Sequence, residues 1–152
     1  MLSQKSISLS ADLTTKAKYG SIGVDFQSQN YINSVGFWVG RHNSLNTTGI
    51  GLNYSIKTQK RNRNKRNLYL IGVIGYSFFR HEQPINKYNI HYLDFSIGYG
   101  MEYKISSNFY ISNSISLGVN LEAINNTTSE INNYLIDASG LIRTGIVYKF
   151  KN

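Results

Sequence analysis

No cysteine occurs among the 152 residues, which excludes disulfide bridges and thiolate metal sites. No apolar run approaches the roughly 20 residues that a membrane-spanning helix requires. Proline occurs only once, as Pro84, whereas tyrosine occurs 12 times. Because tyrosine and isoleucine favour pleated sheets, and because no stretch shows helical periodicity, the sequence predicts an all-β protein. Its length suits one domain with a full core.

Acidic residues are scarce. The chain contains eight Asp and Glu residues and 16 Lys and Arg residues, so the formal net charge is +8 at pH 7. A basic patch attracts nucleic acid, anionic lipid or lipopolysaccharide phosphates, and an ordinary solvated loop is the open alternative. Nucleic-acid binding also requires stacking aromatics or a groove-reading helix beside the charge, and neither is evident, so no nucleic-acid partner is expected. The predicted basic interaction patch consists of Lys60, Arg61, Arg63, Lys65 and Arg66.

The clearest pattern is an alternation of residue types from Tyr92 to Glu122. One parity carries large apolar side chains, with Asn113 as an exception, and the other carries mostly Ser and Gly with isolated charges. The segment Ser106–Asn108 separates the two halves. A period of two places alternate side chains on opposite faces of a sheet, so this segment predicts a long β-hairpin.

The same alternation predicts further strands at about 6–13, 19–27, 34–40, 49–57, 68–80 and 134–150. We expect polar loops at His42–Asn46, His81–Lys87 and Ala123–Asn133. The strand at 68–80 is apolar on both parities, so its facing stays open. Eight sequential strands without a linker predict one domain over residues 1–152, an eight-stranded antiparallel up-and-down β-barrel.

Two arrangements of such a barrel differ in which face is inside. In a soluble lipocalin-like barrel, the apolar face would line a ligand cavity, and the Ser, Gly and Asn face would be an unusually uncharged surface. In a transmembrane barrel, the apolar face meets lipid and the small residues fill a narrow interior, which explains both compositions. We therefore expect the transmembrane form.

Most charged residues of the strands lie on the polar parity, Asp12 among them. Charges that leave bulk water need partners, so these residues predict an ionic network inside the barrel, and a wet face with unrelated charges is the alternative. The predicted lumen charge network consists of Asp25, Lys57, Asp94, Glu102, Lys104, Glu122, Asp137, Arg143 and Lys149.

Residues suited to catalysis or metal binding form no recognised pattern. His42, His81 and His91 lack metal-ligand spacing. Neither a Gly-x-Ser-x-Gly turn nor a phosphate-binding loop occurs. We therefore predict no catalytic residue, metal site or cofactor and expect a protein without enzymatic activity. A lipid-modifying barrel enzyme that builds its site from scattered loop residues is the alternative.

The last predicted strand alternates up to a closing Tyr148-Lys149-Phe150. It resembles the terminal strand of bacterial outer-membrane β-barrel proteins, and the run from Gly145 to Phe150 is similar to the ending of Bacteroidetes-type barrels. The two residues after Phe150 depart from the strict proteobacterial pattern. The resemblance implies a small eight-stranded bacterial outer-membrane barrel with a C-terminal signal for the barrel assembly machinery, carried by Ile146, Tyr148 and Phe150.

The expected role is that of a membrane anchor or a small accessory subunit of a larger outer-membrane complex, with a side-chain-filled polar lumen. Outer-membrane lipid and lipopolysaccharide are the expected partners, and a soluble carrier of an apolar ligand and a narrow pore are the alternatives. Residues 1–4 are interpreted as the remnant of a signal peptide, with a cytoplasmic or recombinant start as the alternative. With periplasmic termini, the basic run 59–67 faces the periplasm; a strand count off by one would turn it towards lipopolysaccharide.

Overall fold

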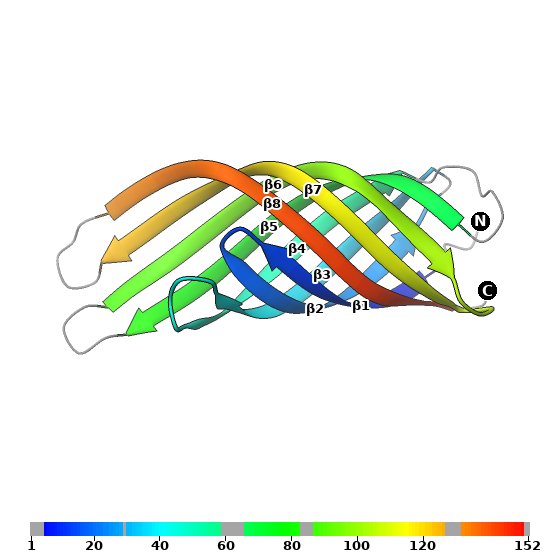
Figure 1. Ribbon diagram of the computed structural model, residues 1–152, viewed down its shortest axis with the longest axis horizontal. Helices are drawn as coiled ribbons and strands as arrows, with labels where there is room; N and C mark the ends of the chain where they lie inside the picture. Colours follow the sequence, from blue (N-terminus) through cyan, green and yellow to red (C-terminus); the bar gives the residue numbers. More distant parts are fainter. Residues whose placement is uncertain (1–4, 29, 59–65, 83–86, 127–131, 151–152) are drawn as a thin grey trace.

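Eight strands follow one another in the computed structural model, which describes residues 5–28, 30–58, 66–82, 87–126 and 132–150 (Figure 1). The strands are β1 (Lys5–Thr14), β2 (Ala17–Gln27), β3 (Tyr31–His42), β4 (Thr48–Thr58), β5 (Arg66–Glu82), β6 (Lys87–Lys104), β7 (Phe109–Asn126) and β8 (Asn132–Lys149). Each strand is antiparallel to the next. The described residues contain no helix that is long and apolar enough to cross a membrane. The predicted all-β class and strand count are confirmed.

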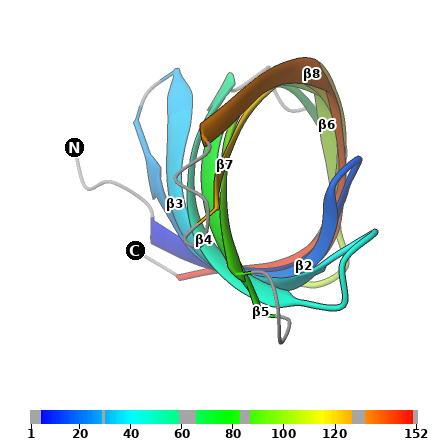
Figure 2. The ribbon, with the colours of Figure 1, turned by 90° about the vertical axis from the view of Figure 1, so that its left-hand side faces the viewer.

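The sheet closes into a barrel because β8 pairs with β1 as well as with β7. The closing register runs from Ser6 opposite Lys149 to Thr14 opposite Leu141. Seen along the barrel, the strands form a ring (Figure 2). Both termini lie at one end, here called the near end, and the turns β1–β2 and β3–β4 lie towards the opposite, far end (Figure 1). The up-and-down path places the end of β4, Thr58, and the start of β5, Arg66, at the near end.

The barrel wall is uneven in height. Strands β1 to β4 have 10 to 12 residues and β5 to β8 have 17 or 18. At the far end, β5 to β8 extend beyond the β1–β2 turn (Figure 1). The predicted loops were too long: His42 belongs to β3, His81 and Glu82 to β5, Lys87 to β6, and much of 123–133 to β7 and β8. These strand ends carry polar residues on both parities, so the sequence loses its alternation where the backbone pairing continues.

The apolar parity faces outward around the whole barrel. Leu9, Ile97 and Leu117 are 64%, 71% and 70% exposed, values at which a water-soluble protein would present a large apolar surface to solvent. Two polar side chains on this face, Asn113 and Thr144, hydrogen-bond to each other across β7 and β8. Such an exterior suits lipid and not water. The soluble lipocalin-like alternative is therefore wrong, because the apolar face does not line the interior.

The facing of β5, which the sequence left open, is decided by space inside the barrel. Tyr69, Ile71, Val73 and Phe79 point inward and are buried. Tyr69 lies opposite Gly100 of β6, and Phe79 lies opposite Gly49 of β4. A Cβ atom at either glycine would collide with the facing ring. The neighbouring strands thus supply, on their inner faces only, the room that the large side chains of β5 require.

Candidate functional site: the barrel interior

The near part of the interior holds two ion pairs. Asp25 accepts hydrogen bonds from Ser6, at 3.0 Å, and from Ser34, and its Oδ2 lies 3.9 Å from Lys57 Nζ. Across the barrel, Lys149 Nζ lies 2.7 Å from Glu102 Oε2 and 4.2 Å from the centre of the Tyr110 ring. The acidic side chains are 3% exposed, so they depend on these partners for the solvation that water no longer provides.

In the middle of the interior, Arg143 of β8 and its cross-strand partner Asp12 of β1 form a two-point contact. Arg143 Nε donates to Asp12 Oδ1 at 2.9 Å, and its terminal nitrogen donates to Oδ2 at 2.7 Å. Ser10 and Ser21 donate further hydrogen bonds to the same carboxylate. A planar guanidinium matches a carboxylate in this geometry, which fixes the two side chains relative to each other on the inner wall.

An aromatic layer lies on the far side of this pair. Tyr19 and Trp38 stack with ring centres 4.5 Å apart, and Phe79 and Tyr92 pack beside them with centres 5.8 Å apart. The Trp38 indole N–H donates to the backbone carbonyl of Tyr76 at 3.1 Å. Four large rings from four strands thus meet inside a wall built mostly of small residues.

The glycines beside Trp38 give the aromatic layer its space. A Cβ atom at Gly51 would overlap the Trp38 indole and the Tyr76 carbonyl, and one at Gly75 would lie 2.7 Å from the other edge of the Trp38 ring. Neither glycine has a backbone conformation that excludes other residues. Glycine is required at these two positions because the neighbouring aromatic rings leave no volume for a side chain.

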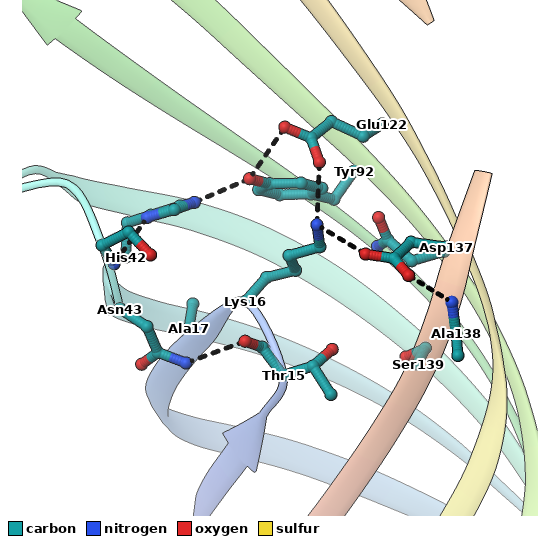
Figure 3. A network of polar contacts seen from close by, with 12 residues as sticks. Thr15, Lys16, Ala17, His42, Asn43, Tyr92, Glu122, Asp137, Ala138 and Ser139 are labelled. Atoms are coloured by element: carbon teal, nitrogen blue, oxygen red, sulfur yellow. Dashed lines mark hydrogen bonds and ion pairs between the residues drawn. The ribbon is translucent and has the colours of Figure 1, made fainter. Parts of the chain in front are cut away.

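A polar network closes the far side of the aromatic layer (Figure 3). Lys16, in the β1–β2 turn, places Nζ 3.0 Å from Glu122 Oε2 and 3.1 Å from Asp137 Oδ2. Tyr92 donates to Glu122 over 3.4 Å and lies 2.7 Å from His42 Nε2. Burial lowers the pKa of Lys16, but the hydrogen bonds and charges of the two carboxylates raise it more, so the net pKa is above its usual value.

The tautomer of His42 follows from its neighbours. Its Nδ1 accepts hydrogen bonds from the backbone N–H groups of Ser44 and Leu45, at 3.1 and 3.0 Å. In the neutral ring the proton therefore lies on Nε2, which donates to the Tyr92 hydroxyl. His42 is half-buried at the end of β3 and is not the solvated loop side chain that the sequence suggested.

The interior leaves little room for another molecule. One cavity of about 20 Å³ has Ser8, Asn53, Lys57 and Arg143 among its lining residues. That volume holds about one water molecule. Within the ranges that the structure describes, His, Asp and Glu side chains form no group suited to a metal ion.

The nine residues predicted as one lumen network lie in separate clusters. Asp25 pairs with Lys57, Glu102 with Lys149, and Arg143 with Asp12, as described above. Glu122 and Asp137 meet at Lys16, and the Asp137 side chain is 58% exposed at the far rim. Asp94 is held by the neutral side chains of Asn120 and Ser139, at 2.7 and 3.0 Å. Lys104 is exposed at the near end of β6, because the strand ends there, and does not reach the interior.

The described residues of the other predicted sites are exposed. Of the basic patch, Lys60, Arg61, Arg63 and Lys65 lie outside the described residues, and Arg66 is exposed at the start of β5. Ile146, Tyr148 and Phe150 of the C-terminal signal face outward, 51%, 36% and 41% exposed. The Tyr148 ring packs against Phe150 and Phe109, with centres 5.2 and 5.0 Å apart.

Sequence reasoning missed the aromatic layer and Lys16. Tyr19 and Trp38 stand in rows made mostly of small or polar residues, and a large ring in such a row signals a position that reaches into the lumen. Lys16 carries no such signal, because its partners lie more than 100 residues away in the chain.

No family model matches the chain, and no curated protein matches its sequence. Solved structures do match its shape. A major outer membrane protein from Thermus thermophilus has a TM-score of 0.70 and 10% identity, over 99% of this chain and 100% of that chain. Neisserial surface protein A has a TM-score of 0.65 and 11% identity, over 97% of this chain and 96% of that chain. For the N-terminal β-barrel domain of Pseudomonas aeruginosa OprF the TM-score is 0.63 and the identity is 12%, over 97% of each chain.

This chain has the fold of the small eight-stranded outer-membrane barrels. At these identities the similarity concerns the fold alone. The likeness of the last strand to Bacteroidetes-type barrels therefore stays a prediction.

Proposed function

We propose that the protein is a non-conducting, non-enzymatic barrel of the bacterial outer membrane, acting as a membrane anchor or as a small accessory subunit of a larger complex. The filled interior is the observation that carries this proposal. The Arg143–Asp12 contact and the aromatic layer both occupy the interior, and the cavity of about 20 Å³ holds about one water. A barrel occupied in this way leaves its outer face and its ends to carry the function.

Outer-membrane location is supported by the apolar exterior and by the three solved barrels, each described as a surface or outer-membrane protein or as a domain of OprF. We place the near end, with both termini, in the periplasm and the tall ends of β5 to β8 outside the cell. In this orientation the β4–β5 connection, with its predicted basic patch, faces the periplasm and meets inner-leaflet phosphates or an acidic protein.

The absence of conduction is directly testable. Purified protein inserted into planar bilayers is expected to give no conductance steps, because ions would have to pass the Arg143–Asp12 pair and the Trp38 layer. Insertion is verified separately, by recovering from the same bilayer lipid a barrel that migrates differently on gels before and after boiling. Reproducible steps of one size from such preparations would favour the narrow pore and overturn the proposal.

The anchor and accessory roles differ in what surrounds the barrel. Mild detergent extraction of native membranes followed by native electrophoresis is expected to show a discrete species larger than the 17.2 kDa chain if the barrel is a subunit. Migration at the size of the isolated barrel would contradict the accessory-subunit role and favour the membrane-anchor role.

Phe150→Ala tests the proposed assembly signal. Phe150 packs on Tyr148 at the outer edge of the closing strand, and we expect its loss to lower the amount of assembled barrel in the outer membrane severalfold, measured as the heat-modifiable fraction. Phe37→Ala is the matched control, because Phe37 is 43% exposed on the same outer face but lies in β3. Equal losses in both variants would show a general effect of apolar surface, and not a signal at the C-terminal strand.

A further inference from the structure

Two cations lie directly opposite each other on the outer face near the far end. Lys18 of β2 and Arg41 of β3 are cross-strand partners, and both are exposed. Like charges at such positions repel and destabilise the pairing. Among the described residues no ion pair includes either of them, and the hydrogen bond of Arg41 goes to the neutral Asn46 amide. Within the described part of the chain, this concentration of positive charge is therefore uncompensated.

A groove lies beside the two cations. Its volume is about 340 Å³, and its lining residues are positively charged, polar or apolar, with none acidic: Lys18, Arg41, His42, Asn43, Ser44, Leu45 and Asn46. The ammonium, the guanidinium and the Ser44 hydroxyl offer several donors to one acceptor group. A phosphate fits this set of donors, because its oxygens accept several charged hydrogen bonds at once.

Directly below the cations, towards the middle of the barrel, the outward face carries a glycine. Gly20 lies two residues from Lys18 on the same outward face, between its cross-strand partners Ala11 and Val39. A Cβ atom at Gly20 would meet no other atom within 4 Å. The next outward residues, Ile22 and Phe37, are apolar and 53% and 43% exposed. The basic pair thus stands where the lipid-facing surface ends, above a space without side chains.

We propose that this place binds one lipid with a phosphorylated headgroup, with the phosphate between Lys18 and Arg41 and an acyl chain over Gly20. The inference rests on the proposed function, since it requires the barrel to stand in a bilayer with its far end outward. In the outer leaflet, the matching chemistry is that of a phosphorylated glycolipid such as lipid A. The apolar surface around Gly20 separates a lipid from a soluble anion, because only a lipid has a chain to lie on it.

The test uses the purified barrel in detergent, with lipid A and phosphatidylcholine as probes and native mass spectrometry as the readout. The wild type is expected to retain lipid A in preference to phosphatidylcholine. K18Q/R41Q is expected to lower lipid A retention about tenfold, through loss of two charged hydrogen-bond donors. K5Q/K104Q is the matched control: it removes two exposed cations from the near end and is expected to bind as the wild type does.

A third variant, Gly20→Leu, places a side chain where the acyl chain is proposed to lie and leaves every charge in place. It is expected to weaken lipid A retention about threefold through lost acyl contact and to leave competition by inorganic pyrophosphate unchanged. Unchanged retention in K18Q/R41Q, or equal loss in the control, would overturn the site. Loss in K18Q/R41Q with wild-type retention in Gly20→Leu would show a soluble-anion site and overturn the lipid. Conductance steps would overturn the proposed function without altering these comparisons.

Discussion

Replacing Gly51 by valine is expected to destabilise the folded barrel strongly. A Cβ at Gly51 would occupy the space of the Trp38 indole and of the Tyr76 carbonyl. The same carbonyl accepts the Trp38 N–H, so the ring cannot move away without losing its hydrogen bond inside the barrel. Overpacking of an interior costs about 1–3 kcal/mol and more where backbone is involved, so we expect at least the upper figure. The measurement is the urea midpoint of the heat-modifiable band in lipid vesicles.

Gly72→Val is the matched control for this experiment. Gly72 lies on the outer face of β5, and a Cβ there meets nothing within 4 Å. The same chemical change should shift stability by no more than about 0.5 kcal/mol, as surface substitutions usually do. If Gly51→Val folded as stably as Gly72→Val, the packing of Trp38 against β4 and β5 would be wrong.

Arg143→Met is expected to cost about 3–5 kcal/mol, because it leaves the Asp12 carboxylate buried without its cation. The side chains of Arg143 and Asp12 are 13% and 0% exposed, so water cannot replace the lost contact. Asp12→Asn in the same chain removes the uncompensated charge, and the double variant should recover a large part of the loss. Unfolding in urea of the wild type, both single variants and the double variant measures the coupling between the two residues.

The exposed pair of Arg80 and Glu82 supplies the comparison. Its atoms lie 2.6 Å apart, closer than those of Arg143 and Asp12, but its side chains are 66% and 51% exposed. Arg80→Met should therefore cost less than about 1 kcal/mol. Equal costs for Arg80→Met and Arg143→Met would contradict the burial of the interior pair.

The sequence determined the strand count and most of the facing, because an interior of small residues and an exterior of apolar ones produce a strict period of two. It could not orient β5, where Tyr69 and Leu70 are both apolar. Gly100 and Gly49 on the neighbouring strands decide which face of β5 points inward. Their position opposite Tyr69 and Phe79 depends on the pairing register between strands, which the sequence of β5 alone does not reveal. The strand ends at 123–126 and 132–133 show no alternation of apolar and polar residues, because asparagines stand on both parities, and the sequence therefore did not predict them as strand.

The interior was predicted less completely than the fold. The polar parity placed Asp25, Lys57, Glu102 and Lys149 inside, but it could not pair them, since cross-barrel partners depend on register and side-chain reach. Lys104 has the same parity, yet it stands where β6 ends. The parity of a residue in its strand predicts whether its side chain points inward, but not how far along the barrel axis it lies. The charged residues therefore lie in separate clusters and not in the single network that the sequence predicted.

The central claim is that the apolar parity faces lipid. Since the chain contains no cysteine, single-cysteine variants at Ile97, Leu117 and the turn residue Ser107 would each carry one nitroxide label. In lipid bilayers, collisions with dissolved oxygen should exceed those with a water-soluble nickel chelate at Ile97 and Leu117, and the order should reverse at Ser107. Nickel collisions that exceed oxygen collisions at Leu117, as they should at Ser107, would contradict the claim.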